Sequence, residues 1–140
     1  MEDRQATAVA LRLSVGRLAR RLRQESLGEL TPSQRSALAS LDREGPLRMS
    51  DLANIERVSP PSLTGIVSRL EQRGLVVREV NPDDARSTVV SITTDARQLL
   101  AAIRAKRTAF LAERLANLSE EEVSTLNQAV ALLERITERP

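Results

Sequence analysis

The chain of 140 residues contains no cysteine, histidine, tryptophan or tyrosine. Without cysteine it has no disulfide framework, no thiolate metal site and no thiol redox switch. Without histidine as well, the usual zinc, copper and iron ligand sets cannot be assembled, so we expect no metal and no cofactor. The commonest general base and the thiol nucleophile are also missing, and no G-x-S-x-G motif or phosphate-binding glycine loop occurs. We therefore predict that the protein is not an enzyme.

Aromatic residues and long apolar runs are scarce too. The lone aromatic residue, Phe110, cannot form a stacking platform for single-stranded nucleic acid. No apolar run approaches the length of about eighteen residues that spans a membrane, and the chain starts with the charged segment MEDRQ instead of a signal peptide. We expect a cytoplasmic protein of one domain-sized unit that makes no contact with a membrane.

Local signals predict helices on both sides of a central segment. A capping box at residues 31–34 opens a helix to about residue 43, and a second box at residues 119–122 opens the last helix. Another long helix is expected over residues 95–115, and the first runs over residues 6–27. Heptad-like apolar spacing marks the first and last helices, at Ala8, Leu11, Val15, Leu18 and Leu22 and at Val123, Leu126, Val130 and Leu133. These stripes indicate helices that pack together, within one subunit or across two.

The central segment, residues 49–93, predicts two short helices followed by a β-hairpin. Ser50 can cap the first helix, and Ser59 followed by two prolines starts the second, which ends at Gly74. The β-branched runs 75–80 and 87–92 are expected strands, separated by the polar turn-forming residues 81–86. The predicted fold is therefore mainly α with a small β-hairpin wing, a winged helix-turn-helix, and it indicates double-stranded DNA as a partner.

The chain resembles the MarR-type bacterial transcription regulators over nearly its whole length. The residues that carry the resemblance are Leu52-Ala53, Val58-Ser59-Pro60-Pro61-Ser62, Leu70-Glu71-Gln72-Arg73-Gly74-Leu75-Val76, Asp83-Asp84-Ala85-Arg86 and Ile92-Thr93. Two positions depart from the pattern. Arg57 lies at the turn, where many helix-turn-helix proteins carry glycine, and Gly65 lies in the recognition helix, where relatives often carry a larger polar or basic residue.

The second helix of the pair is the expected recognition helix. Its apolar residues, Leu63, Ile66, Val67 and Leu70, recur at helical spacing and should face inward. The outward set predicted to contact DNA is Ser59, Ser62, Thr64, Gly65, Ser68, Arg69 and Gln72. Arg69 is the best candidate for a guanine or phosphate contact. Gly65 indicates either a close approach to DNA or a tolerated substitution.

The expected wing carries the second set of DNA contacts. The resemblance implies that Arg86 enters the minor groove while Asp84 braces it, and a weakly hydrated guanidinium suits the negative potential there. Arg78 is a further candidate in the wing, and Arg57 is a secondary phosphate contact. Residues 31–97 hold nine arginines and nine acids, so DNA binding must depend on where the charges lie and not on their sum.

The resemblance also implies how the protein is organised. Residues 1–30 form an N-terminal dimerisation helix, residues 31–93 the DNA-binding lobe and residues 94–140 the C-terminal dimerisation helices of one continuous unit. The predicted dimerisation residues are Leu11, Val15, Leu18, Leu22, Phe110, Val123, Leu126, Val130 and Leu133. A two-fold dimer would face a pseudo-palindromic site with recognition helices roughly 34 Å apart.

The resemblance implies a repressor that releases DNA when a small molecule, often an anionic aromatic, binds between the dimer helices and the winged lobe. The residues that line such an effector site are unknown from the sequence. Arg17 and Arg20 could pair with a carboxylate, or could simply keep a solvated helix face. The alternative to a regulator is a helical protein-interaction module that kept the winged fold and does not bind DNA.

Overall fold

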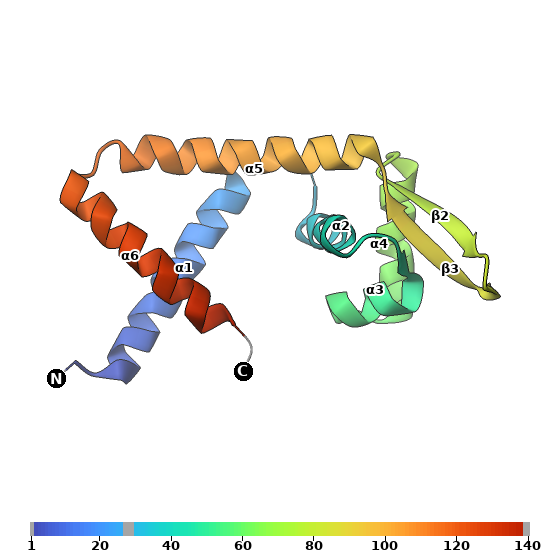
Figure 1. The fold of residues 1–140 in the computed structure, drawn as a ribbon, viewed down its shortest axis with the longest axis horizontal. Helices are drawn as coiled ribbons and strands as arrows, with labels where there is room; N and C mark the ends of the chain where they lie inside the picture. The colour runs from blue at the N-terminus through green and yellow to red at the C-terminus, as the bar shows by residue number, and fades with distance from the viewer. Residues whose placement is uncertain (1, 27–29, 139–140) are drawn as a thin grey trace.

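The computed structural model describes residues 2–26 and 30–138, and within them six helices and three strands (Figure 1). Helix α5 runs along the molecule and joins two ends (Figure 1). Helices α1 and α6 and both chain termini lie at one end, while α2, α3, α4 and the strands lie at the other. The elements are α1 (Arg4–Gln24), α2 (Pro32–Glu44), β1 (Leu47–Arg48), α3 (Met49–Glu56), α4 (Pro60–Gln72), β2 (Val76–Asn81), β3 (Asp84–Ile92), α5 (Thr94–Leu115) and α6 (Glu120–Thr137).

All the helices predicted from the sequence are confirmed, with differences at their ends. Both capping boxes form, with the Thr31 and Ser119 side chains each accepting from the backbone three residues on. The predicted cap at Ser50 is wrong, because α3 already begins at Met49 and its N-cap residue is Arg48. The predicted end of the first helix, Leu27, lies outside the described residues, and α1 ends at Gln24.

The wing is a three-stranded antiparallel sheet in the order β1-β3-β2, where a hairpin was expected. The added strand, β1, pairs Leu47 with Val90. The prediction that residues 81–86 form the loop between the strands is wrong at both ends, since β2 continues to Asn81 and β3 begins at Asp84. Asn81 pairs with Asp84 across a tight turn, and the Asn81 side chain accepts the Asp83 backbone N–H at 3.0 Å. This side-chain bond closes the turn after two residues instead of six.

The hydrophobic core lies in the winged lobe. Three α4 residues, Leu63, Val67 and Leu70, are buried there with residues of α2, α3 and the sheet, which confirms the predicted inward face. Ala96 and Leu100 at the start of α5 are buried in the same cluster. Each fully buried Leu or Val side chain contributes about 1.5–3 kcal/mol to folding. The core therefore fixes both the orientation of α4 and the direction in which α5 leaves the lobe.

The terminal helices behave differently, since none of the described residues of α1 or α6 is buried. Phe110 of α5 is half-buried, and the guanidinium carbons of Arg21 and Arg114 lie 5.2 and 4.9 Å from its ring centre. Within the described part of the chain, none of the helices is long and apolar enough to cross a membrane. Nor do the acidic side chains of that part gather into a group that could hold a metal ion.

Candidate nucleic-acid interface

The start of α4 is organised by two serines. Ser59 is the N-cap, and its hydroxyl oxygen accepts the Ser62 backbone N–H at 3.3 Å. The Ser59 hydroxyl donates in turn to the Ser62 hydroxyl at 3.0 Å. Because Pro60 and Pro61 carry no N–H, few unsatisfied donors remain in this first turn. The Ser62 hydroxyl keeps its own proton available for a ligand at the helix N-terminus.

The outward face of α4 lies where the sequence predicted it. Six of the seven predicted residues are exposed, Ser59, Ser62, Thr64, Gly65, Arg69 and Gln72, and Ser68 is half-buried. Thr64 donates its hydroxyl proton to the Pro60 carbonyl at 2.9 Å, so this side chain is left as an acceptor. Arg69 makes no ion pair with any acid that the structure describes. Its five donors are free to meet a phosphate or a guanine edge.

Gly65 lies in the interior of α4, on this exposed face. A Cβ atom added there would meet nothing within 4 Å, so the packing of the chain itself does not require a glycine. A glycine in a helix interior costs about 0.8–1.0 kcal/mol relative to alanine. No contact within the described part of the chain compensates for this loss of stability.

The turn between α3 and α4 contains a strained arginine. Arg57 has φ 56° and ψ 44°, the left-handed conformation that residues other than glycine rarely adopt. The turn is closed by a hydrogen bond of 3.1 Å from the Val58 N–H to the Ala53 carbonyl. The sequence departure at Arg57 is therefore accommodated without loss of the turn, and its side chain is exposed beside the start of α4.

The wing presents Arg86 from an irregular part of β3. Val80 pairs with Thr88 and Asn81 with Asp84, which leaves residues 85–87 of β3 as a bulge without paired partners. Bulges of this kind re-aim side chains at functional sites. Asp84 accepts the Arg86 backbone N–H at 3.0 Å, so the carboxylate holds the backbone of the bulge in place. The Arg86 side chain is exposed.

Arg78 is engaged within the lobe. Its Nε and one terminal nitrogen donate to the two carboxylate oxygens of Glu71 at 3.2 and 2.8 Å, an ion pair that joins β2 to the end of α4. The hydrogen bond from Arg78 lowers the pKa of Glu71, and the same bond raises the pKa of Arg78. This fork-to-fork geometry fixes the position of the hairpin relative to α4.

Sequence reasoning missed one basic residue near the wing. Arg48 lies with Arg86 on the border of a hollow of about 260 Å³ between the start of α3 and the wing. Its guanidinium donates to Asp51 at 2.9 Å, and this bond raises the pKa of Arg48. No local signal could have placed Arg48 here, because its position depends on the pairing of β1 with β3.

Comparison with known proteins agrees with this geometry. The model of the MarR family matches residues 30–88. An uncharacterised HTH-type transcriptional regulator of Mycobacterium leprae is 40% identical over 93% of this chain and 92% of its own. The HTH-type transcriptional repressor MdtR of Bacillus subtilis is 32% identical over 91% of this chain and 86% of its own.

A solved structure extends the likeness to the terminal helices. A putative transcriptional regulator from Pseudomonas aeruginosa is 34% identical and covers 99% of this chain and 100% of its own, with a TM-score of 0.85. The likeness therefore includes α1, α5 and α6 as well as the winged lobe. The chain belongs to the MarR family of winged helix-turn-helix transcriptional regulators, which bind DNA and are not enzymes.

Proposed function

We propose that the protein is a homodimeric, cytoplasmic repressor that binds a pseudo-palindromic operator and releases it when a small anionic ligand binds. The observation that carries this proposal is the exposed, polar face of α4 at the same end of the molecule as the wing with Arg86 (Figure 1). The repressor relative in Bacillus subtilis supports the sign of regulation. No observation favours an interaction module without DNA binding.

In this proposal α4 lies in the major groove. Ser62 at its first turn contacts a phosphate through its hydroxyl proton, and Ser59 holds that hydroxyl in place at the helix N-terminus, where an anion is favoured. Ser68, Arg69 and Gln72, further along the helix, contact base edges. Gly65 then lets the helix approach the DNA more closely than a residue with a side chain would allow.

The wing contributes the minor-groove contact. Arg86 projects from the bulge in β3, and Asp84 acts by holding the Arg86 backbone. Arg57 provides a phosphate contact beside the start of α4, which gives a reason for an arginine in a left-handed conformation at that turn. Arg78 serves mainly through its ion pair with Glu71, which sets the angle between wing and helix.

Dimerisation is supported by the apolar surface of the terminal helices. Of the predicted interface residues, Val15, Leu18, Leu126 and Val130 are 44–53% exposed, and the others are half-buried. Four further apolar residues of these two helices are exposed. The prediction missed them because it assigned only one apolar stripe to each helix: Val9, Leu13, Leu132 and Ile136. Helix stability in water comes mainly from packing of an apolar face, so a helix of 21 residues with no buried side chain needs a partner. A second copy of the chain supplies that partner. In this arrangement residues 1–30 and 94–140 contain the dimerisation helices, and residues 31–93 form the DNA-binding lobe.

The decisive experiment measures binding of the full chain to a labelled duplex covering the region upstream of its own gene. Fluorescence anisotropy across a range of salt concentrations gives the affinity and its salt slope, and a scrambled duplex of equal composition is the control. We expect tighter binding to the upstream duplex and a stoichiometry of two chains per duplex. Equal affinity for both duplexes at every salt concentration would contradict sequence-specific binding.

A further inference from the structure

Helices α2 and α5 are joined by a carboxylate that faces two arginines. Asp42 lies near the end of α2, and one of its carboxylate oxygens is 3.8 Å from Nε of Arg97. Arg104 donates to the other oxygen from both terminal nitrogens, at 3.4 and 3.5 Å. The two arginines lie about two helical turns apart on one face of α5, so Asp42 joins α2 to a stretch of α5 roughly 10 Å long. We call these contacts the Asp42 bridge.

The Asp42 bridge lies at an apolar junction of the same two helices. Leu41, the neighbour of Asp42, is fully buried, and Leu100, which lies between the two arginines in the sequence, is 2% exposed. Both leucines belong to the core of the winged lobe. The Asp42 side chain is 29% exposed, and both arginine side chains are 60% exposed. Because water screens ion pairs of this kind, the bridge adds little to the stability of the fold, and we expect its effect on function to be a few-fold.

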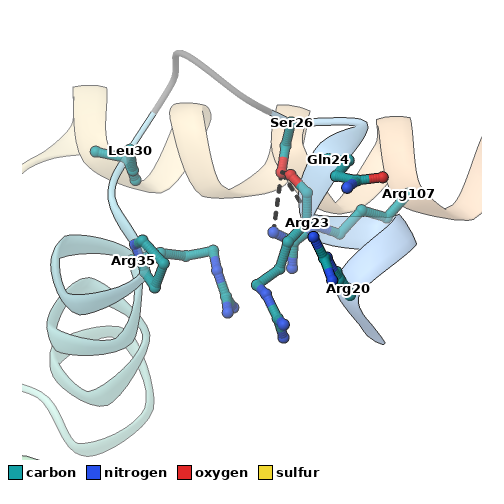
Figure 2. Close-up of a pocket in the computed structure, with 8 residues that line it drawn as sticks. Arg20, Arg23, Gln24, Ser26, Leu30, Arg35 and Arg107 are labelled. Carbon is teal, nitrogen blue, oxygen red and sulfur yellow. Dashed lines mark hydrogen bonds between the residues drawn. The ribbon is translucent and has the colours of Figure 1, made fainter. Parts of the chain in front are cut away.

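The other end of the contact between α2 and α5 is organised differently. Arg107, further along α5, donates to the Ser26 hydroxyl just after α1, from Nε at 3.3 Å and from a terminal nitrogen at 2.9 Å (Figure 2). Arg35 of α2 has the same charge as Arg107. Burial lowers the pKa of Arg107, and the charge of Arg35 lowers it further. The charge attraction that the structure describes between α2 and α5 is therefore at the Asp42 bridge.

Helix α2 moves together with the recognition helix. Leu38 of α2 is buried in one core with Leu63 and Val67 of α4. Protein interiors are close-packed, so α2 and α4 shift as one body. Helix α5 connects this lobe to α6, and both α1 and α6 lie at the far end of the molecule (Figure 1). The angle between α5 and α2 therefore sets the position of α4 relative to the terminal helices.

We propose that Asp42 is a positioning residue for operator binding. By holding Arg97 and Arg104 it restricts the angle between the winged lobe and α5, and in a dimer it thereby restricts the separation of the two recognition helices. The restricted angle follows from the bridge itself, while its consequence for the operator rests on the DNA-binding function proposed above. A lobe that is already held at the right angle loses less conformational freedom on binding DNA. Without the bridge, the protein should accept half-site spacings that the wild type rejects.

The first test measures the angle without DNA. The chain has no cysteine, so Asn54→Cys on α3 and Glu113→Cys on α5 provide two sites for spin labels, and both positions are exposed. Doubly labelled chain diluted into an excess of unlabelled chain gives the distance between the lobe and α5 within one subunit by pulsed electron paramagnetic resonance. We expect Asp42→Asn, which keeps the size of the side chain and removes its charge, to broaden the distribution of this distance. A distribution as narrow as that of the wild type overturns the proposal.

Matched variants show whether the broadening comes from the bridge. Glu44→Gln removes the same charge from the last turn of α2, where Glu44 pairs with Arg43 of its own helix, and should leave the distribution unchanged. Arg104→Gln should broaden the distribution as Asp42→Asn does, and the two changes together should add little, because they remove the same interaction. Equal broadening by Glu44→Gln, or full addition of the two changes, would overturn the bridge. Circular dichroism melting of each variant verifies folding.

A second measurement connects the bridge to DNA. Hydroxyl-radical footprinting locates the dyad of the upstream duplex, and one base pair inserted there rotates one half-site by about 34° relative to the other. Fluorescence anisotropy then compares the affinities for the natural and the altered duplex. We expect the wild type to bind the altered duplex at least about tenfold more weakly, because the misplaced half-site loses base contacts. Asp42→Asn should lower this ratio to about threefold by weakening binding to the natural spacing.

The outcomes separate this inference from the proposed function. Glu44→Gln should keep the wild-type ratio, and a ratio that Asp42→Asn leaves unchanged would refute the positioning role in DNA binding. A wild-type protein that does not bind the upstream duplex specifically would sink the proposed function, whereas the restricted angle would still stand on the distance measurement.

Discussion

Replacing Gly65 with alanine should stabilise the protein and weaken its binding to DNA. The added Cβ atom meets nothing within 4 Å, so the change brings no steric cost in the free protein. Alanine in a helix interior is favoured over glycine by about 0.8–1.0 kcal/mol. We therefore expect Gly65→Ala to raise the free energy of unfolding by about 1 kcal/mol and the melting temperature by roughly 3–5 °C.

The effect on DNA binding has the opposite sign. In the proposed complex the middle of α4 approaches the DNA closely, and an added methyl group must be accommodated there. Forcing an extra carbon into a filled contact costs about 1–3 kcal/mol. Because about 1.4 kcal/mol corresponds to a tenfold change in affinity and the proposed dimer places two copies of α4 on the DNA, we expect DNA binding to weaken by at least about thirtyfold.

Urea denaturation followed by circular dichroism measures the stability, and fluorescence anisotropy with the upstream duplex measures the affinity. Gly16→Ala is the matched control, since Gly16 also lies in a helix interior, in α1, with nothing within 4 Å of its Cβ position. The control should stabilise the protein similarly and leave DNA affinity unchanged. A Gly65→Ala variant with wild-type DNA affinity would refute the close approach, and one without added stability would refute the helix-propensity argument.

Three further variants test other parts of the proposal. Arg86→Ala should weaken DNA binding at least tenfold and lower the salt slope by about one for each subunit, as loss of one cation near the phosphates does. Val130→Glu, on the exposed face of α6, should convert the dimer to monomer in light scattering after gel filtration. Glu71→Gln should lower stability at neutral pH by breaking the pair with Arg78. The pKa of Glu71 is lowered in the folded protein. The ion pair therefore contributes to stability at pH values above the ordinary pKa of about 4.5, and this contribution disappears as the pH falls through the folded pKa.

Each variant has a result that contradicts its reasoning. Unchanged affinity of Arg86→Ala at moderate salt would show that the wing does not reach the DNA. A Val130→Glu protein that remains dimeric would place the interface elsewhere on the chain. Wild-type and Glu71→Gln stability curves that stay parallel down to acidic pH would show that the ion pair with Arg78 does not form in solution.

The helices of this chain could be predicted because their signals are local. Thr31, Ser59 and Ser119 each accept a backbone N–H three residues on, so the sequence itself contains both partners of the bond. The inward face of α4 is equally local, since 3.6-residue periodicity alone selects Leu63, Val67 and Leu70. The same reasoning identified the outward residues that the structure exposes.

What could not be predicted depends on contacts between distant residues. Strand β1 has only two residues, and only its pairing with β3, about forty positions away, makes it a strand. The pair of Glu71 with Arg78 joins a helix end to a strand, and the hydrogen bond of Arg107 to Ser26 spans 81 positions. Four arginines that border one hollow, Arg20, Arg23, Arg35 and Arg107, come from three helices, so no window of sequence shows them together.

The winged lobe carries no net charge, but its charged side chains are placed so that they favour DNA binding. Several of its acids are engaged by neighbouring arginines, as Asp51 is by Arg48 and Glu71 by Arg78. The exposed arginines of the proposed interface, Arg57, Arg69 and Arg86, form no ion pair with the described acids.

These three arginines of each subunit give six cations in a dimer, which predicts a plot of log affinity against log salt with a slope of about −5. Salt titration of the wild-type protein on the upstream duplex measures this slope directly. A value near −10 would mean that the paired arginines also leave their carboxylates to contact phosphates. A value near −2 would mean that only one arginine of each subunit reaches the DNA.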